Sequence, residues 1–351
     1  MEDYLVVGLG LAGMAFCETL EQHGKSFRVL DDHTLQASKV AGGIYNPVVL
    51  KRLKRAWKAD VQLPLVAPFY KKLEEKLQIR CHHSLPVLRL FASVAEQNRW
   101  FAAADTTALR PFLSTEIHHN QNPGLNAQYG FGQVIGTGRV DTAALLTAYS
   151  RYLKNAGRYM DSCFDFNRLK LKPDHVSYEG VDALKIVFAT GYRLLDNPFF
   201  NYLPLQGNKG EYLEIRCPEL RETHIIKGPV FLIPLGDDAY LAGATYEWKD
   251  MTATPGFKAR EYLCRKLDEM LEVPYEITGQ LAGIRPTIPD RRPLVGRHPE
   301  YKQLFLINGF GSRGVMIAPY AAEQLWAVAE NGQSADPEMD VQRYKGKWLS
   351  S

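Results

Sequence analysis

The start of the chain alternates apolar runs with one amphipathic segment. Tyr4–Val7 is an apolar run of strand type, residues 11–23 have the spacing of a helix that Gly24 ends, and Phe27–Leu30 is a second apolar run. Glycines fill the turn between the first run and the helix. This order predicts a strand, a tight turn, a helix and a parallel strand, which together form a β-α-β unit.

Strand-like and helix-like patterns continue to the C-terminus. Apolar runs predict strands over residues 87–91, 181–191 and 304–307, and several runs between residues 212 and 245 predict an antiparallel sheet. Apolar positions recurring at helical spacing predict helices over residues 66–77, 94–104, 142–156, 257–271 and 315–330.

A further helix is predicted over residues 50–58, with apolar residues on one side and a basic stripe on another. The stripe consists of Lys51, Lys54, Arg55 and Lys58. Such a stripe is either a solvated helix face or a contact for a polyanion, and the pattern leaves both interpretations open.

A strand, a glycine turn and a helix near each end of the chain indicate that one domain is discontinuous. We predict an α/β fold with a discontinuous Rossmann-like nucleotide-binding domain formed by residues 1–84, 135–192 and 281–351. Residues 85–134 and 193–280 are expected to form an α+β substrate domain with a mainly antiparallel sheet.

Composition narrows the class of protein. The 351 residues are 46% hydrophobic and 23% charged, with a formal net charge of +3, which excludes a disordered or strongly polyanion-binding chain. No apolar run reaches membrane-spanning length, and the first strand begins too early for a signal peptide, so a cytoplasmic location is expected. The five cysteines are scattered without a CxxC motif, and His82-His83 and His118-His119 lack ligand spacing, so we expect no metal site.

The glycine turn has the spacing of a dinucleotide-binding motif. Gly8, Gly10 and Gly13 form GxGxxG, where the first glycine allows the turn, the second admits a pyrophosphate and the third lets helix and strand pack. Asp31, followed by Asp32, ends the second strand, where a carboxylate can accept hydrogen bonds from a ribose. This unit alone is compatible with either NAD or FAD.

The next segment, residues 37–47, is rich in small side chains. Ser38, Gly42 and Gly43 would let this loop lie close to a ligand or another backbone, although an ordinary connecting loop has the same composition.

The C-terminal motifs resemble those of the D-amino-acid oxidase and glycine oxidase superfamily of FAD-dependent amine oxidoreductases. The motifs are AGIRPTIPD, RPLVGRHPE and NGFGSRGVMIAP within residues 282–319. Ala189-Thr190-Gly191 is similar to the family's ATG strand end, and Val140-Asp141 to its VDP helix start, with Thr142 in place of proline.

The resemblance implies FAD as cofactor and an oxidoreductase that acts on the C–N bond of a small amino acid or secondary amine carrying a carboxylate, by hydride transfer to flavin N5. In the family pattern, the late glycine turn at Gly311–Gly314 faces the pyrimidine edge of the flavin through backbone N–H groups. The implied cofactor-binding residues are Gly8, Gly10, Leu11, Ala12, Gly13, Asp31, Asp32, Ser38, Gly42, Gly43, Ala189, Thr190, Gly191, Gly309, Gly311, Ser312, Arg313, Gly314 and Val315.

Arg285, Arg313 and Tyr246 are the candidate catalytic residues. Arg285 matches the family arginine that binds the substrate carboxylate, and a guanidinium can do so with two hydrogen bonds. A structural arginine paired with an acidic neighbour is the alternative. For Tyr246 and Arg313, pocket and packing roles both stay open, because glycine oxidase has its late-turn arginine where Ser312 stands. Phe231 stands where glycine oxidase has a tyrosine, which favours a substrate other than glycine.

Other segments resemble the FAD-dependent oxidase half of the bifunctional enzyme that modifies carboxymethylaminomethyl-uridine at the tRNA wobble position. These are Gly311–Gly314 (GSRG), Gly243–Tyr246 (GATY) and residues 41–47 (AGGIYNP), the last with Asn46 inserted relative to that enzyme's pattern. A tRNA wobble-uridine oxidase is therefore a second hypothesis, after a small-amine oxidoreductase. A non-enzymatic flavoprotein is the third.

Overall fold

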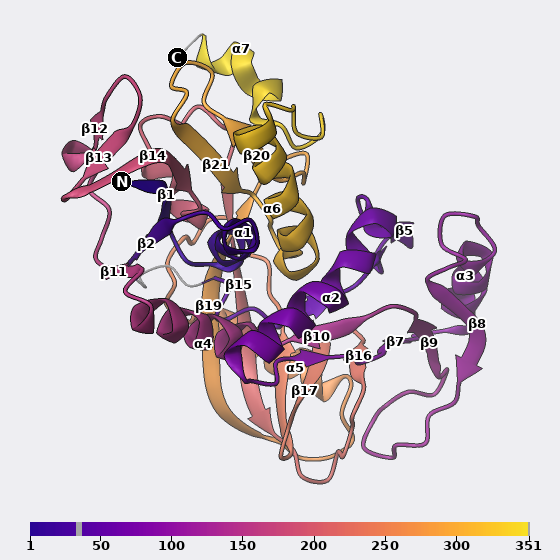
Figure 1. Cartoon of the computed structure of the whole chain (residues 1–351). Coiled ribbons are helices and arrows are strands. Elements are labelled where there is room, and N and C mark those ends of the chain that lie inside the picture. Colours follow the sequence, from indigo (N-terminus) through magenta and orange to yellow (C-terminus); the bar gives the residue numbers. More distant parts are fainter. Residues whose placement is uncertain (33–36, 350–351) are drawn as a thin grey trace.

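The computed structural model describes residues 1–32 and 37–349 of the chain. Figure 1 shows its first and last segments side by side, with α1 (Leu11–Gln22) next to α6 (Gly314–Asn331), and the antiparallel sheet below them. The predicted helix boundaries for α1 and α6 are therefore close to the observed ones, and the two ends of the chain build one layer together.

The first sheet has a parallel centre in the order β11-β2-β1-β14-β21. Its central strands are almost fully apolar and buried, as expected for strands covered on both faces. Three edge strands, β12, β13 and β20, pair antiparallel with it. The strands are β1 (Glu2–Val7), β2 (Phe27–Asp31), β11 (Tyr159–Asp161), β12 (Lys170–Leu171), β13 (Val176–Tyr178), β14 (Val181–Phe188), β20 (Leu294–Arg297) and β21 (Leu304–Asn308).

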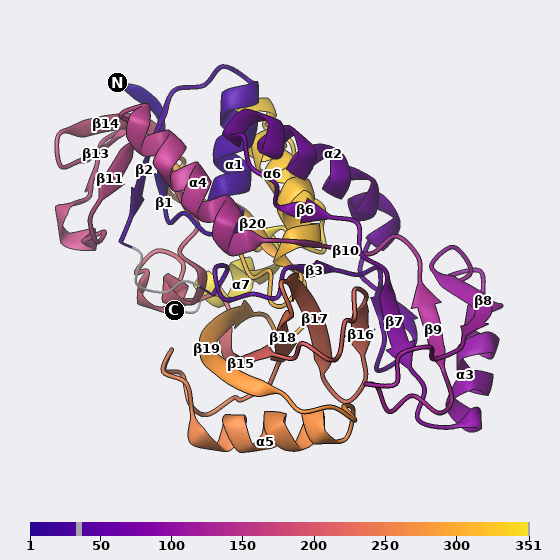
Figure 2. The same ribbon diagram turned by 90° about the horizontal axis from the view of Figure 1, so that it is seen from below.

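Helices α1, α2 (Ala59–Leu77), α4 (Thr142–Asn155) and α6 gather on one side of the molecule in Figure 2. Their apolar faces and one face of the first sheet form a common hydrophobic core that includes Phe16, Tyr70, Tyr149 and Phe305. Asp141 caps α4, because its carboxylate accepts a hydrogen bond from the Ala144 N–H at 3.0 Å. Packing in this core holds the helices against the parallel sheet, next to the glycine turn.

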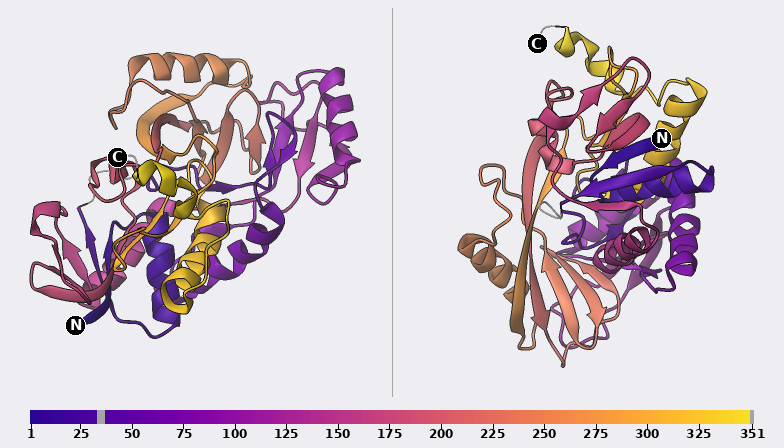
Figure 3. Two further views of the ribbon diagram at one scale, coloured as in Figure 1. Left: turned by 90° about the horizontal axis from the view of Figure 1, so that it is seen from above. Right: turned by 60° about the vertical axis from the view of Figure 1, so that its left-hand side comes forward.

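The second large sheet has the order β19-β15-β18-β17-β16-β7-β9-β8 and is antiparallel except where β16 meets β7. Helix α5 (Phe257–Asp268) covers its outer face, and α3 (Val94–Ala104) packs beside β8 (Figure 2; Figure 3, left). The strands are β7 (Val87–Leu90), β8 (Leu113–His118), β9 (Phe131–Val134), β15 (Gln206–Arg216), β16 (Ile225–Lys227), β17 (Phe231–Gly236), β18 (Ala239–Gly243) and β19 (Glu276–Thr287).

Two small sheets and several short helical turns complete the fold. Strands β3, β10 and β6 form a three-stranded sheet, and β4 pairs with β5. The bounds are β3 (Ile44–Tyr45), β4 (Val48–Val49), β5 (Lys54–Arg55), β6 (His82–His83), β10 (Gly138–Val140), three 3₁₀ turns at Phe166–Arg168, Gly191–Asp196 and Val341–Tyr344, and α7 (Lys345–Trp348). Gly43 allows the close approach to β10, because a Cβ there would lie 1.9 Å from the Val140 carbonyl oxygen.

The predicted fold class is confirmed, but the helix predicted over residues 50–58 is wrong. That segment contains a turn and β5, and α2 begins only at Ala59. Leu53 and Lys58 have φ angles of +44° and +46°, which are incompatible with a continuous right-handed helix. The helical spacing of the basic residues is therefore coincidental.

The domain boundaries stay a prediction. Strand β19 passes through the expected boundary at residue 281 and pairs with β15 along the whole of residues 206–216. No helix within residues 1–32 and 37–349 is long and apolar enough to span a membrane.

Candidate active site

The β1–α1 turn has the geometry of a nucleotide-binding turn. Gly8 has a φ of +97°, and a Cβ at this position would lie 2.7 Å from the Ala189 carbonyl oxygen. A Cβ on Gly13 would lie 2.0 Å from the Gly8 carbonyl oxygen, so the close approach of α1 to the turn requires glycine. The first turn of α1 has no acidic residue, which leaves the positive end of the helix for a phosphate.

Asp31 and Asp32 end β2 beside this turn. The Asp31 carboxylate accepts hydrogen bonds from the Leu9 N–H and the Tyr159 hydroxyl, both at 3.2 Å. Asp32 forms an ion pair with Arg193. Asp31 is therefore oriented by two donors at the place expected for a ribose contact, whereas Asp32 is tied to the loop after β14.

A cavity of about 680 Å³ lies between the glycine turn, the end of the parallel sheet and the antiparallel sheet. It brings together all but one of the candidate site residues. Gly13 is the exception, because it packs behind the turn. The candidate residues that line the cavity are Gly8, Gly10, Leu11, Ala12, Asp31, Asp32, Ser38, Gly42, Gly43, Ala189, Thr190, Gly191, Tyr246, Arg285, Gly309, Gly311, Ser312, Arg313, Gly314 and Val315.

Unpaired polar atoms show that the nucleotide end of the cavity suits a polar ligand. The hydroxyls of Ser162 and Thr190 line the cavity and are buried without a hydrogen-bond partner in the described part of the chain. A buried unsatisfied hydroxyl costs about 1–3 kcal/mol, so a ligand that bonds to these two oxygens would be favoured. The N-terminus of α1, where the Ser38 hydroxyl accepts a hydrogen bond from the Leu11 N–H at 3.2 Å, and the Asp31 carboxylate lie at the same end of the cavity. Together these groups fit a dinucleotide.

Arg285 lies at the other end of the cavity, on β19 opposite Asn208 of β15. Its Nη1 donates to the Asn208 Oδ1 at 2.7 Å and to the Thr245 carbonyl oxygen at 3.2 Å. The Tyr246 ring centroid lies 4.7 Å from the guanidinium carbon, within the range of a cation–π contact. Within residues 1–32 and 37–349 no carboxylate forms an ion pair with Arg285, so its charge is held by neutral groups alone.

The sequence did not single out the neighbours that make room for Arg285. A Cβ on Gly210 would lie 1.9 Å from the Arg285 Nη2, so only glycine at this position leaves space for the guanidinium. Tyr212 lies beside Arg285 and Gly42, and burial raises the pKa of its hydroxyl although the arginine charge opposes this. A glycine inside a strand is a signal of close approach and could have identified this place.

Arg313 precedes α6, where its Nη1 donates to the Asn46 carbonyl oxygen at 3.0 Å. Burial lowers the pKa of Arg313, the neighbouring Tyr246 opposes this, and Arg291 adds to it. Like Arg285, Arg313 has no carboxylate ion-pair partner among the described residues. Phe231 and Lys227 also line the cavity, and burial, with repulsion from Arg89, lowers the pKa of Lys227 to about 8.

His82, a member of the first histidine pair, packs against an aromatic side chain. The Tyr45 hydroxyl lies 3.0 Å from the His82 Nε2, and the two rings stack. In residues 1–32 and 37–349 no group of three or more histidine, cysteine, aspartate or glutamate side chains could hold a metal ion.

Residues 3–327 match the sequence model of a family described as FAD dependent oxidoreductase (DAO). The chain belongs to this family. FAD is accordingly its cofactor, and the glycine turn, the oriented Asp31 and the unpaired hydroxyls of Ser162 and Thr190 are the features of the cavity that fit it.

Relatives with curated functions match this chain over different lengths. Glycine oxidase from Bacillus subtilis (strain 168) is 27% identical over 39% of this chain and 38% of its own length. The tRNA 5-methylaminomethyl-2-thiouridine biosynthesis bifunctional protein MnmC from Marinobacter nauticus is 22% identical over 92% of this chain and 55% of its own length. The chain thus matches about half or less of these relatives.

Solved structures share the fold over nearly the whole chain. Glycine oxidase from Geobacillus kaustophilus superposes with a TM-score of 0.77 at 20% identity, covering 96% of both chains. Iminodiacetate oxidase from Chelativorans sp. BNC1 superposes with a TM-score of 0.74 at 18% identity, covering 97% of this chain and 98% of that one. At this level of identity the likeness establishes the DAO fold and leaves the substrate to be inferred from the site.

Proposed function

We propose that the protein oxidises the C–N bond of a small amino acid or secondary amine that carries a carboxylate. The observation that carries this proposal is the environment of Arg285. Its guanidinium lines the cavity and is held by the Asn208 amide oxygen and the Thr245 carbonyl, with no carboxylate partner among the described residues. A half-buried cation held only by neutral acceptors favours an anionic ligand.

Arg285 would bind the substrate carboxylate and thereby fix the adjacent carbon and nitrogen within the cavity. FAD, when bound, supplies the two-electron acceptor that takes hydride from this carbon. The substrate becomes an imine, which water hydrolyses to a carbonyl compound and an amine. A substrate amine that is already neutral gives up hydride without a protein base, and we assign no side chain to that role.

The late glycine turn would stabilise negative charge at the flavin end of the cavity. Gly311–Gly314 line the cavity and lead directly into α6, a helix of 18 residues. The N–H groups of Gly311 and Arg313 donate to the Pro286 and Phe310 carbonyls at 2.9 and 3.1 Å, so the N–H groups of Ser312 and Gly314 would face the negative charge. Arg313 lies in the same turn and would add a full positive charge there. Tyr246 would close the substrate end, because its ring lies over the Arg285 guanidinium.

A second candidate function is oxidation of a carboxymethylaminomethyl group on tRNA wobble uridine. It is favoured by the relatives named MnmC, such as that from Azoarcus sp. (strain BH72), which is 24% identical over 96% of this chain. Tyr246 and Trp248 are 65% and 50% exposed, and aromatic side chains of this kind can stack on bases.

Anaerobic bleaching of the bound flavin tests both functions. The purified, FAD-loaded protein is mixed with a panel of amino acids, N-alkyl amino acids including iminodiacetate, and tRNA carrying carboxymethylaminomethyl-uridine. Bleaching by a free amine, with peroxide released in air, is expected. Bleaching by the modified tRNA alone would favour the second function, and a flavin that no member bleaches would contradict both.

A further inference from the structure

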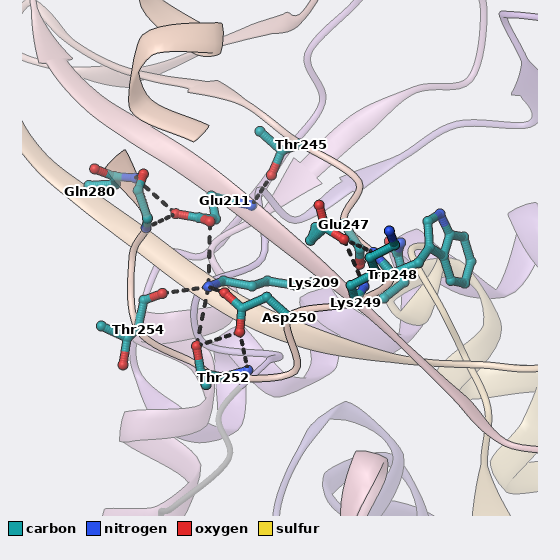
Figure 4. A network of polar contacts seen from close by, with 12 residues as sticks. Lys209, Glu211, Thr245, Glu247, Trp248, Lys249, Asp250, Thr252, Thr254 and Gln280 are labelled. Carbon is teal, nitrogen blue, oxygen red and sulfur yellow. Dashed lines mark hydrogen bonds and ion pairs between the residues drawn. The ribbon is translucent and has the colours of Figure 1, made fainter. Parts of the chain in front are cut away.

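Lys209 of β15 is a lysine buried at the centre of a polar network (Figure 4). Its side chain is 1% exposed, and its Nζ donates to the Asp250 carboxylate and the Thr254 carbonyl oxygen, both at 2.6 Å. The Thr252 hydroxyl lies 3.4 Å and the Glu211 carboxylate 3.6 Å from the same nitrogen. Burying an ammonium group removes its hydration, which costs free energy, so it occurs only where several acceptors surround the group.

The network attaches one segment, residues 245–256, which we call the strap. At the start of the strap, the Thr245 N–H donates to the Glu211 carbonyl at 3.1 Å, and the Thr245 hydroxyl accepts from the Glu211 N–H at 2.9 Å. The N–H groups of Lys209 and Glu247 each donate to the carbonyl of the other at 2.8 and 2.9 Å. At its end, the Gly256 N–H donates to the Glu211 carboxylate at 2.7 Å. The three contacts to Asp250, Thr252 and Thr254 come from the Lys209 Nζ, so this one nitrogen holds the middle of the strap to β15.

The opposite face of β15 supports Arg285. Side chains alternate between the faces of a strand, so Asn208 and Gly210 face Arg285 while Lys209 and Glu211 face the strap. The Asn208 Nδ2 also donates to the Glu247 carbonyl oxygen of the strap at 3.3 Å. Asn208 bonds to the Arg285 guanidinium and Gly210 makes room for it. The strap itself contributes the Thr245 carbonyl and the Tyr246 ring to Arg285. The same four residues of β15 therefore connect the strap to the anion-binding end of the cavity.

We propose that Lys209 is a positioning residue: by holding the strap against β15, it keeps the Thr245 carbonyl and the Tyr246 ring in place around the Arg285 guanidinium. The assignment of Arg285 to a substrate carboxylate rests on the proposed function, whereas the attachment of the strap does not. Lys209 is absent from the cavity lining and acts through these two neighbours.

The substitution Lys209→Met removes the charge at nearly constant length and is examined in the FAD-loaded protein. Trypsin cleaves after Lys249, which is exposed within the strap, and we expect this cleavage to become at least about tenfold faster as the strap detaches. The dissociation constant of N-acetylglycine, a carboxylate whose amide nitrogen resists oxidation, is measured by flavin absorbance and is expected to rise about tenfold. For an oxidised amine, KM should rise more than kcat falls.

Two further sets of variants distinguish a positioning role of Lys209 from a general loss of folding. Lys266→Met is the control, because Lys266 of α5 forms an ion pair with Glu269, the residue that follows this helix, and has no contact with the strap among the described ion pairs. Asp250→Ala removes the carboxylate that pairs with Lys209, at a side chain that is 47% exposed, so the fold should persist. The hydrogen bond from Lys209 lowers the pKa of Asp250 to about 2, so this ion pair is present at neutral pH. Asp250→Glu retains a carboxylate and should restore protection from trypsin.

Unchanged cleavage after Lys249 in both Lys209→Met and Asp250→Ala would overturn the inference. Faster cleavage with unchanged affinity for N-acetylglycine would also overturn it, because the strap would then have no influence on Arg285. If the wild-type protein binds N-acetylglycine but oxidises no amine, only the proposed function fails. If it binds no carboxylate at all, the anion site at Arg285 and this inference fail together.

Discussion

At the scale of single residues, the arrangement around Arg285 depends on what its neighbours lack. Asn208 offers an amide oxygen where a carboxylate would neutralise the guanidinium, and Gly210 offers no side chain where a Cβ would overlap with it. A carboxylate in place of the Asn208 amide, or a side chain at Gly210, should therefore alter substrate binding more than it alters folding.

Replacing Arg285 by alanine should raise KM for a carboxylate substrate by a factor of about 100, because a charge-assisted pair contributes about 1.5–3 kcal/mol. Steady-state kinetics with the best substrate of the panel measures this. Arg110→Ala is the control, since the Arg110 side chain is exposed and donates to the Asp105 carbonyl oxygen. An unchanged KM in Arg285→Ala would exclude this arginine from the substrate site.

The substitution Gly210→Ala should lower kcat/KM by about 10–100-fold, because the added Cβ would lie 1.9 Å from the Arg285 Nη2 and must displace the guanidinium. Flavin content and circular dichroism should stay close to wild type. Gly346→Ala, where a Cβ meets nothing within 4 Å, is the matched control. Equal kcat/KM in the two variants would show that Arg285 tolerates a shift.

At the scale of elements, the C-terminal end of α6 is fastened to the parallel sheet by Glu330. Its carboxylate accepts from the Tyr4 hydroxyl on β1 at 2.5 Å, and it pairs with Lys25 at 2.6 Å and with Lys185 on β14. Burial raises the pKa of Glu330, but hydrogen bonds from Lys185, Lys25 and Tyr4 outweigh it and lower the pKa to about 2. Helix α6 and its glycine turn thus depend on a carboxylate at the far end of the helix.

The substitution Glu330→Gln should lower the free energy of unfolding by about 1–3 kcal/mol at pH 7, after allowance for solvent screening of a partly exposed pair. The lowered pKa means that this contribution is complete above about pH 4.5 and is lost as the pH falls through about 2. Urea denaturation at pH 7 and near pH 2.5 measures both. A difference between variant and wild type that is the same at the two pH values would contradict the assignment. Glu269→Gln, on a surface pair, should change little.

At the scale of the whole molecule, segments from both ends and the middle of the chain enclose one cavity. Bound FAD would contact all of them and should therefore stabilise the entire fold. Free FAD at about 100 times its dissociation constant should add about 2.7 kcal/mol to the free energy of unfolding. Thermal denaturation of the apoprotein with increasing FAD measures this, and AMP, which lacks the flavin half, is the control. A transition temperature that does not respond to FAD would contradict binding in this cavity.

The local patterns were sufficient for the β-α-β unit, for α3, α4, α5 and α6 and for the long apolar strands β7, β14 and β21, because each of these elements has a continuous run or face of apolar residues. They did not predict β19, the strand that carries Arg285. They were insufficient at residues 50–58, where basic side chains at helical spacing occur in a turn and strand. The spacing of charges says little there, because two left-handed residues set the backbone. The motif glycines were found from sequence because their role is local to one turn.

Sequence alone determined the glycine turn after β1 and the motif that contains Arg285, since each depends on residues close together in the chain. It also indicated the fold class, from motifs near both ends of the chain. Tertiary structure decided which groups surround Arg285. Asn208, Gly210, Thr245 and Tyr246 reach it from β15 and the strap, roughly 40 to 80 residues away in sequence, and no periodicity links positions so far apart. The long pairing of β15 with β19, and the buried Lys209 beneath the strap, bring these residues together.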